Sequence, residues 1–293
     1  MANSRTAGVE LGGTKTILVL GHGSEIVEQI ALATDAPEMT LAAANAQLRD
    51  WHAAAPLAAL GIASFGPLDL ARGAMLPTPK PHWTDARIRD ALNAGLDVPV
   101  AIDTDVNGAA LAEFRWGAGA KQGFASLCYI TIGTGLGGGI VIDGAPVHGA
   151  MHPEVGHIRV RRAPGDTFGG TCPFHGDCLE GLVSGPALAA RFGMAGALIP
   201  DNHPQWAHVA AELADAIATL FLVTSVEAVL VGGGVGTARA GLLPAVRAHV
   251  VANLGGYLPF IDAASVEARI AAPVLGERAG PLGALALALD ALP

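Results

Sequence analysis

Residues 8–32 read "GVELGGTKTILVLGHGSEIVEQIAL", three short β-rich runs separated by the turns "GG" and "GHGS". Tight glycine turns between β-rich runs are typical of a three-stranded meander. Residues 127–147, "LCYITIGTGLGGGIVIDGAPV", repeat the pattern of strand, glycine turn, strand, "DG" turn and strand. Two copies of one supersecondary unit in one chain predict a duplicated α/β domain with a cleft between the copies.

The segments between and after the two meanders predict alternating helices and buried strands. The helical segments are Leu41–Ala55, Asn107–Trp116, Trp206–Val223, Ala238–Ala252 and Gly280–Leu292, and the buried strands are Leu60–Phe65, Val98–Ile102 and Val226–Val231. This alternation favours mixed sheets covered by helices, the α/β class. The pattern loosens near Glu113–Gly123, so we expect an N-terminal domain over residues 1–115 and a larger domain over 116–279. A last helix at about 280–293 can return to the first domain.

The composition is that of a compact globular chain and argues against nucleic-acid binding. The 293 residues are 51% hydrophobic and 15% charged, with a formal net charge of −9. A chain of this length can form two domains, each with its own core. Binding to a phosphate backbone needs clustered Lys and Arg, which this acidic chain lacks. The densest basic run, "RVRR" at Arg159–Arg162, is interpreted as a solvated strand edge.

The sequence predicts neither export nor membrane insertion. Glu10 lies where a signal peptide would need its apolar region, which favours a cytoplasmic location. Residues 123–142 carry no formal charge and are about long enough to span a bilayer. Their six glycines and the "DG" that follows favour strand, turn and strand instead. The odd number of cysteines, three, argues against a structural disulfide in a reducing compartment.

The glycine turns indicate anion binding rather than dinucleotide binding. "GTGLGG" at Gly133–Gly138 fits the pattern G-x-G-x-x-G, but that fingerprint needs a helix directly after the turn, and "GGIVIDG" reads as a strand. The hairpins Gly12–Thr16 and Thr131–Gly135 can together point backbone N–H groups and threonine hydroxyls at one anion, although either hairpin alone needs no ligand. A third cluster, "LVGGGVG" at Leu230–Gly236, follows a buried strand, and a ligand site and a close-packed turn are both open for it.

Two aspartates follow a core strand in "VAIDTDVNGAALAEF" at residues 100–114. Asp103 and Asp105 alternate in strand register, and Asn107 is expected to cap the helix that follows. For Asp103 a capping role and a functional role are both open. Asp105, at the end of a core strand that faces the interdomain cleft, is predicted to accept a proton from a substrate hydroxyl.

The loop "CPFHGDC" at residues 172–178 indicates a metal site. Cys172 and Cys178 flank His175 at equal separations, and "EVGHI" places His157 fifteen residues before the first cysteine. Two thiolates and two imidazoles are ligands that tetrahedral Zn²⁺ prefers, and a complete set of four indicates a structural site. The alternative, a loop with incidental polar residues, is disfavoured because free cysteines in an exposed loop oxidise.

Eight motifs in this order resemble the ROK family of sugar kinases, and most closely its bacterial fructokinase branch. They are "ELGGTKT", "ASFGPLDL", "TPKPHW", "DTDVNGAALAE", "TIGTGLGGGIV", "HPEVGH", "CPFHGDCLEG" and "LVGGGV", and they span nearly the whole chain. The resemblance implies the actin-like, hexokinase-like fold of two ribonuclease H-like domains, with ATP and Mg²⁺ in the cleft and a sugar beside Asp105. It also implies a homodimer.

The same resemblance implies a role for each matching residue. Asp105 would be the general base, and the sugar would be bound by Gly66, Thr104, Asp105, Glu154, His157 and Glu180. ATP would be held at its phosphates by Gly12, Gly13, Thr14, Lys15, Thr131, Gly133, Thr134 and Gly135, and near its adenosine by Gly232, Gly233 and Gly234. Zinc would be bound by His157, Cys172, His175 and Cys178. Many family members carry a third cysteine at the position of His175, and glucokinase-type members carry asparagine at that of Thr104; both departures resemble fructokinases.

The predicted reaction is the ATP-dependent phosphorylation of D-fructose to fructose 6-phosphate. In the expected mechanism Asp105 takes the proton of a primary sugar hydroxyl as its oxygen attacks the γ-phosphorus of MgATP. Zinc is expected to order the loop that presents Glu154 and His157 to the sugar. A glucokinase, a mannokinase or another hexose kinase is the alternative. A sugar-sensing regulator is a further alternative, disfavoured because the first hairpin begins too near residue 1 for a helix-turn-helix and because the net charge is acidic.

Overall fold

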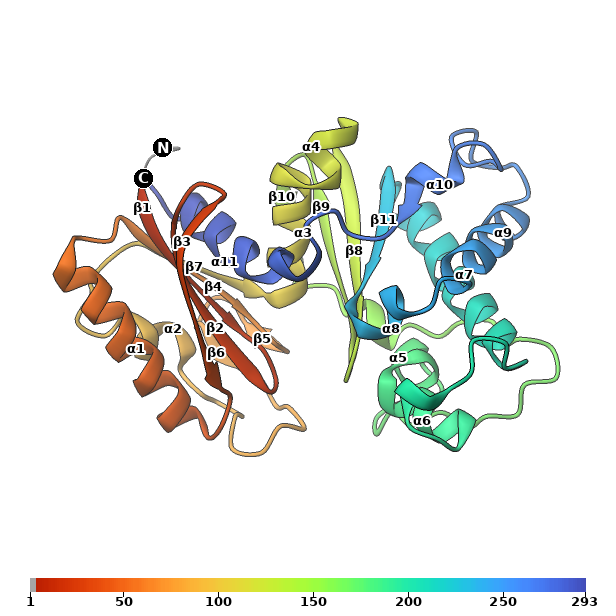
Figure 1. The fold of residues 1–293 in the computed structure, drawn as a ribbon, viewed down its shortest axis with the longest axis horizontal. Helices are drawn as coiled ribbons and strands as arrows, with labels where there is room; N and C mark the ends of the chain where they lie inside the picture. The colour runs from red at the N-terminus through yellow and green to blue at the C-terminus, as the bar shows by residue number, and fades with distance from the viewer. Residues whose placement is uncertain (1–3) are drawn as a thin grey trace. The chain divides into compact units, whose positions relative to one another are not determined.

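The computed structural model describes residues 4–293 and divides into two compact units (Figure 1). The first unit comprises Met1–Gln122, Gly144–Pro153 and Glu277–Pro293, and the second comprises Gly123–Asp143 and Glu154–Gly276. Two five-stranded sheets of mixed strand direction form the framework. The α/β class predicted from the alternation of strands and helices is therefore confirmed.

The sheet of the first unit begins with the meander predicted from the glycine turns. Strands β1 (Arg5–Leu11), β2 (Lys15–His22) and β3 (Glu25–Ala33) pair antiparallel in sequence. Strands β4 (Ala59–Ser64) and β7 (Val100–Thr104) extend the sheet in parallel, which gives the order β3-β2-β1-β4-β7. Because β1, β4 and β7 run parallel, Leu11, Ser64 and Thr104 end at the same edge of the sheet.

The C-terminal helix α11 (Ala279–Asp290) packs against β1 and β4, and against helix α3 (Asp105–Trp116) (Figure 1). The approach is close because the strands carry glycine beneath the helix. A Cβ atom placed on Gly61 would lie 1.9 Å from the backbone oxygen of Ala284, so no other residue fits there without moving the helix. The chain therefore returns, at its end, to the sheet with which it began.

A second layer packs on the face of the first unit's sheet opposite α11, and the core lies between this layer and the sheet (Figure 1). Its elements are α1 (Pro37–Ala54), β5 (Leu68–Asp69), β6 (Ala74–Met75) and α2 (Ile88–Asn93), and the short helix α4 (Ala118–Gln122) follows α3. The core cluster runs from the strand residues Val9 and Ile62 to Leu48 of α1 and Leu92 of α2. Trp83 is fully buried in it, with its ring edge-on to Phe65 at 5.1 Å.

The sheet of the second unit is built around the second meander. Strands β8 (Ser126–Ile132) and β9 (Leu136–Ile142) pair antiparallel, and β11 (Ala228–Gly232) runs parallel to β8. With β10 (Ala145–Pro146) and β12 (Ile270–Ala271) at its edges, the order is β10-β9-β8-β11-β12. The uncharged segment 123–142 is thus strand, turn and strand, as predicted.

Short helices and two longer ones complete the second unit. They are η1 (Val155–His157), α5 (Leu179–Val183), α6 (Gly185–Phe192), η2 (Gly196–Leu198), α7 (Trp206–Thr224), α8 (Gly233–Ala238), α9 (Leu242–Leu254) and α10 (Val266–Arg269), and η3 (Gly276–Arg278) precedes α11. Helix α7 is long and apolar enough to cross a membrane by composition, but 56% of its apolar window is buried inside the protein. A core helix of a globular unit has this property, since it is surrounded by its own fold.

Two predicted element boundaries are wrong, at the start of the helix predicted from Ala238 and at the end of the strand predicted to Ile102. The helix predicted over Ala238–Ala252 begins at Leu242 instead, because Arg239 is extended (φ −121°, ψ 105°) and α8 ends at Ala238. The strand predicted over Val98–Ile102 continues to Thr104, and the helix begins at Asp105. Asp105 is therefore a helical residue and does not share strand register with Asp103.

The basic run Arg159–Arg162 is not a solvated strand edge, since it contains one isolated bridge residue and an inward-facing arginine. Arg162 pairs through Nε with Glu212 at 3.0 Å and through Nη2 with Asp166 at 2.5 Å. Glu212 is fully buried on α7, and a buried carboxylate needs a cation or donors to offset its desolvation. Arg191, which is also buried, contacts the same two carboxylates at 2.8 and 2.5 Å.

Candidate functional site

Asp105 is the first residue of α3, directly after the carboxyl end of β7. Its Oδ1 accepts a hydrogen bond from the Val106 N–H at 2.9 Å. The N-cap of the helix is Thr104, whose hydroxyl accepts from the Asn107 N–H at 3.1 Å, so the prediction that Asn107 is the cap was wrong by three residues. A carboxylate in the first turn of a twelve-residue helix faces the positive end of the helix dipole, which favours its ionised form.

The predicted phosphate turn of the first unit joins β1 to β2. The Gly12 N–H donates to the Lys15 carbonyl at 3.1 Å, and a Cβ on Gly12 would lie 2.8 Å from that oxygen, so glycine is required for this turn. Gly13 and Thr14 form its exposed tip. Lys80, from the segment "TPKPHW", places its ammonium 2.5 Å from the Gly13 carbonyl and 3.4 Å from that of Thr34.

Glu10 is a residue of this region that the sequence reasoning missed. It lies in β1 between the fully buried Val9 and Leu11, and its Oε2 is buried with no hydrogen-bond partner among residues 4–293. Burial, and then the charge of Asp105, raise the pKa of Glu10 to about 7, whereas Lys15 lowers it. An acidic residue inside an otherwise apolar core strand, directly before a glycine turn, was the available signal in the sequence.

Gly66 follows β4 in the same unit and is joined to Pro67 by a cis peptide bond. A Cβ on Gly66 would lie 3.6 Å from the ring of His152. The His152 ring is buried, and its Nε2 accepts a hydrogen bond from the Leu68 N–H at 3.0 Å. Burial lowers the pKa of His152, which is consistent with a neutral acceptor. His152 therefore shapes the turn that presents Gly66.

The second predicted phosphate turn joins β8 to β9 in the second unit. The Gly133 N–H donates to Gly135 at 2.9 Å, and the Gly133 carbonyl accepts from the Gly185 N–H at 2.7 Å. Thr134 is at the exposed tip, and Thr131 is half-buried in β8. Both glycine hairpins of the sequence are therefore hairpins in the structure.

Glu180 links the second hairpin to helix α5. Its Oε2 accepts from the Leu136 N–H at 3.0 Å, and a Cβ on Gly135 would lie 2.9 Å from the same oxygen. Gly135 thus leaves the space that this carboxylate occupies. A residue predicted to bind sugar and a turn predicted to bind phosphate are in direct contact.

The third glycine cluster lies where β11 ends and α8 begins. Gly233 has a φ of +79°, and a Cβ there would lie 2.4 Å from the Ile132 carbonyl, so the backbone packs directly on the end of β8. A Cβ on Gly232 would lie 2.7 Å from the Tyr129 hydroxyl, whereas at Gly234 the space within 4 Å is open. Close packing therefore explains why Gly232 and Gly233 are glycines. The adenosine site at this cluster stays a prediction.

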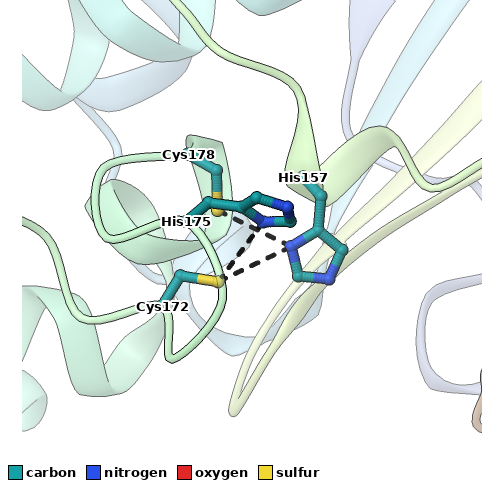
Figure 2. Close-up of side chains that lie close together, drawn as sticks. All are labelled: His157, Cys172, His175 and Cys178. Atoms are coloured by element: carbon teal, nitrogen blue, oxygen red, sulfur yellow. Dashed lines mark hydrogen bonds between the residues drawn. The ribbon is translucent and has the colours of Figure 1, made fainter.

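The four predicted metal ligands converge in the second unit (Figure 2). Their ligand atoms all lie within 4.8 Å of one another. His157 Nδ1 lies 3.7 Å from Cys172 Sγ and 3.6 Å from Cys178 Sγ, and His175 Nδ1 lies 3.7 Å from Cys172 Sγ. In a tetrahedral zinc site the nitrogen–sulfur edge is about 3.5 Å, from bond lengths of about 2.0 and 2.3 Å. The donor set and its spacing both fit zinc.

The loop is folded to bring its two cysteines together. Cys172 and Gly176 exchange two backbone hydrogen bonds, at 3.1 and 2.9 Å, and Gly176 has a φ of +65° that a side chain would strain. Desolvation by burial is the largest cause that raises the pKa of Cys178, to about 11, and the neighbouring Cys172 adds to it. Two thiols so close release their protons readily only when a cation holds the thiolates.

Glu154 immediately precedes η1, three residues from the ligand His157. Its side chain is exposed, but desolvation is still the largest cause that raises its pKa; the charge of His157 lowers the pKa and that of Glu180 raises it. Glu154, Glu180 and His157 therefore form one electrostatically coupled group in the second unit.

Ion pairs connect the loop of residues 172–178 to the rest of the second unit. Asp177, next to Cys178, pairs with Arg162 at 3.3 Å and also with Arg159. Since Arg162 also pairs with the buried Glu212 of α7, the loop is connected to the core helix of its unit. The metal ligands are thus supported by a network that includes the basic run of the sequence.

The comparisons with known proteins agree with one another. Residues 6–291 match the ROK family. The chain is 40% identical over 302 residues to the fructokinase of Zymomonas mobilis, with 97% of this chain and 96% of that protein covered. The ROK hexokinase structure from Thermus thermophilus superposes with a TM-score of 0.79 at 30% identity, covering 98% of both chains.

A second solved structure is the ROK family glucokinase from Streptomyces griseus in complex with glucose and AMPPNP. It superposes with a TM-score of 0.76 at 28% identity and covers 98% of this chain and 100% of that one. These likenesses confirm the predicted actin-like, hexokinase-like fold. Because the family match and both superpositions extend over nearly the whole length, the chain belongs to the ROK family.

Proposed function

We propose that the protein is an ATP-dependent hexose kinase that phosphorylates D-fructose to fructose 6-phosphate. The observation that carries the proposal is the place of Asp105 at the start of α3, in a chain of the ROK family. The charge of Asp105 acts on Glu10, the residue of β1 that lies just before the Gly12–Lys15 turn. The preference for fructose is supported by the likeness to a fructokinase over nearly the full length of both proteins.

In the proposed reaction Asp105 accepts the proton of the primary hydroxyl that attacks the γ-phosphorus. Its place in the first helical turn favours the carboxylate form that a base needs. A general base of this kind typically contributes about 10²–10⁴-fold. The rest of the acceleration would come from positioning, because the phosphoryl transition state is loose and requires aligned groups more than covalent chemistry.

Backbone N–H groups at the tips of the two glycine hairpins would bind the phosphates. The Gly12 and Gly133 N–H groups already donate within their own turns, so the contacts would fall to Gly13 and Thr14 in one unit and to Thr134 in the other. Gly232, Gly233 and Gly234 would lie near the adenosine. Lys15 is exposed at the start of β2 and would add a positive charge at the phosphates.

The residues of the first unit fit a magnesium ion. Glu10 has a buried oxygen that no described residue hydrogen-bonds, and the charge of Asp105 acts on it. Carboxylate oxygens together with substrate phosphates are the ligands that Mg²⁺ prefers. Glu10 would hold the ion together with the substrate phosphates, and the ion would neutralise phosphate charge when it is bound.

The second unit would bind the sugar hydroxyls through Glu154 and Glu180, while Gly66 and Thr104 of the first unit would line the same ligand. Zinc at His157, Cys172, His175 and Cys178 would order the segment that carries Glu154 and take no part in the chemistry. Both roles rest on the family motifs, on the short sequence separation of Glu154 from His157, and on the coupling between Glu154 and Glu180.

A coupled ADP-release assay with MgATP tests this proposal. Purified protein is given fructose, glucose, mannose and N-acetylated hexoses, and kcat/KM is compared. We expect the highest value with fructose, and a loss of about 10²–10⁴-fold in kcat for Asp105→Asn with a melting temperature no lower than that of the wild type. A higher value with glucose would make the protein a glucokinase, and sugar binding without ADP release would favour the sugar-sensing regulator.

Location and assembly belong to the same proposal. We place the reaction in the cytoplasm, where ATP is available, with a homodimer as the working assembly and no nucleic-acid partner. The acidic net charge of −9 supports the last point. Light scattering of the purified protein measures its mass, and a value of one chain would exclude the dimer.

A further inference from the structure

Asp103 is an almost fully buried carboxylate, 2% exposed, at the end of β7. Its Oδ1 accepts hydrogen bonds from the Thr104 N–H at 2.7 Å and from Asn107 Nδ2 at 2.8 Å. Thr104 and Asn107 are themselves joined by the N-cap bond of α3. Asp103 therefore holds both sides of the turn in which Asp105 lies.

The other oxygen of Asp103 contacts a histidine distant in sequence. His148 Nε2 lies 2.8 Å from Asp103 Oδ2, and 3.4 Å from Asn107 Nδ2. The hydrogen bond to Asp103 is the largest cause that raises the pKa of His148, and the charge of Asp103 adds to it, while burial lowers it. His148 Nε2 is therefore the donor and the carboxylate the acceptor.

We propose that His148 is a positioning residue for phosphoryl transfer, which acts through Asp103 and Asn107 to fix the first turn of α3 and with it Asp105. A carboxylate that must meet a sugar hydroxyl needs a fixed geometry, because a displacement of about 1 Å can cost about a hundredfold in rate. The 2.8 Å contact between His148 Nε2 and Asp103 Oδ2 ties this turn to a segment 45 residues further along the chain.

The second histidine of the same segment has a different task. His152 accepts from the Leu68 N–H and is buried, so its Nε2 is committed to that backbone contact. Its ring and that of His148 influence each other's charge, and Asp103 acts on both. Asp103 is the titratable group that shifts the pKa of His148, and it also connects His148 to the turn of Asp105.

This inference rests on the proposed kinase function, and its test separates the two. His148→Leu removes the donor, and His148→Gln restores an N–H where Nε2 stands. We expect His148→Leu to lower kcat by about ten- to a hundredfold while KM for sugar and ATP changes by less than about twofold, and His148→Gln to recover most of the rate. His249→Leu, at an exposed position on α9, is the matched control and should keep the wild-type rate.

A double variant decides whether His148 acts through the base. In an Asp105→Asn background, His148→Leu should cost little further rate, since groups that act as a unit are not additive. A full additional loss there, or a rise in KM for the sugar as the main effect, would overturn the proposal. So would wild-type kcat in His148→Leu.

NMR spectroscopy tests the contacts of His148 independently of kinase activity. Histidine side-chain NMR should show the pKa of His148 falling in Asp103→Asn, and the amide signals of Thr104 and Asn107 shifting in His148→Leu but not in His148→Gln. Unchanged signals would refute the network. A wild-type protein that transfers no phosphate to any sugar, but shows these shifts, would refute the proposed function and leave the network standing.

Discussion

Glu10 makes the folded protein less stable at alkaline pH, and its removal should show this directly. The pKa of Glu10 rises from 4.5 to about 7 on folding, chiefly because of burial. The folded state therefore binds more protons than the unfolded state between these two values, and stability falls as the pH rises through that window. Above pH 7 the full penalty applies.

The penalty follows from the difference of 2.5 between the two pKa values (7 − 4.5). At 1.36 kcal/mol for each pKa unit this corresponds to about 3 kcal/mol, which solvent at the partly exposed carboxylate reduces to about 2 kcal/mol. Glu10→Gln keeps the shape and removes the charge. We expect the variant to gain about 2 kcal/mol at pH 8, which is about 4–8 °C in melting temperature, and less than about 1 kcal/mol at pH 5.

Thermal melts of the magnesium-free and nucleotide-free protein between pH 5 and pH 8 measure this difference. Glu28→Gln, at an exposed position on β3, is the control and should change the melting temperature little at any pH. Asp105→Asn should reproduce a smaller part of the gain, because the Asp105 charge is the second cause of the shift. A pH-independent difference between Glu10→Gln and wild type would refute the reasoning.

Three further outcomes are expected. Cys178→Ser should lose the metal measured by mass spectrometry and lower the melting temperature, because a structural zinc contributes directly to folding; a metal-free wild-type protein would contradict the zinc assignment. Lys80→Met removes the ammonium from the Gly13 carbonyl and should raise KM for ATP by about tenfold, as a charged hydrogen bond is worth about 1.5–3 kcal/mol, with kcat affected less. Thr104→Ala should cost about 1 kcal/mol in urea denaturation and Thr104→Ser almost nothing, and equal losses would exclude the N-cap as the cause.

Local turn chemistry explains which parts of the fold the sequence predicted. The meanders were predictable because glycine turns between β-rich runs are a short-range signal, and both hairpins formed where "GGTKT" and "TIGTG" stand. The convergence of the four predicted metal ligands was indicated by three of them, since Cys172, His175 and Cys178 lie in one short loop, and His157 joins them from fifteen residues earlier. The start of α9 at Leu242 was not, because Gly241 precedes it without a capping side chain and the extended backbone of Arg239 ends α8.

The segment "DTDVN" shows where local rules stop. Asp, Thr and Asn are all good N-caps, so the sequence cannot choose among four of these five positions. The choice falls on Thr104 because Asp103 is committed to His148, which lies 45 residues further along the chain, and to Asn107. A long-range contact thus fixes the register of the helix, and with it the place of Asp105.

The three acidic groups of the first unit differ in what their surroundings supply, and this difference assigns their tasks. Asp103 accepts three hydrogen bonds from groups of its own unit, which commits both of its oxygens to holding structure. Asp105 accepts from the first turn of a helix, which favours its charge. Glu10 has a buried oxygen without a donor and a pKa near neutrality, so a cation is what would make its ionised form stable. Burial and donor count are tertiary properties, and they distinguish the proposed positioning carboxylate, the proposed base and the proposed metal ligand, which look alike in the sequence.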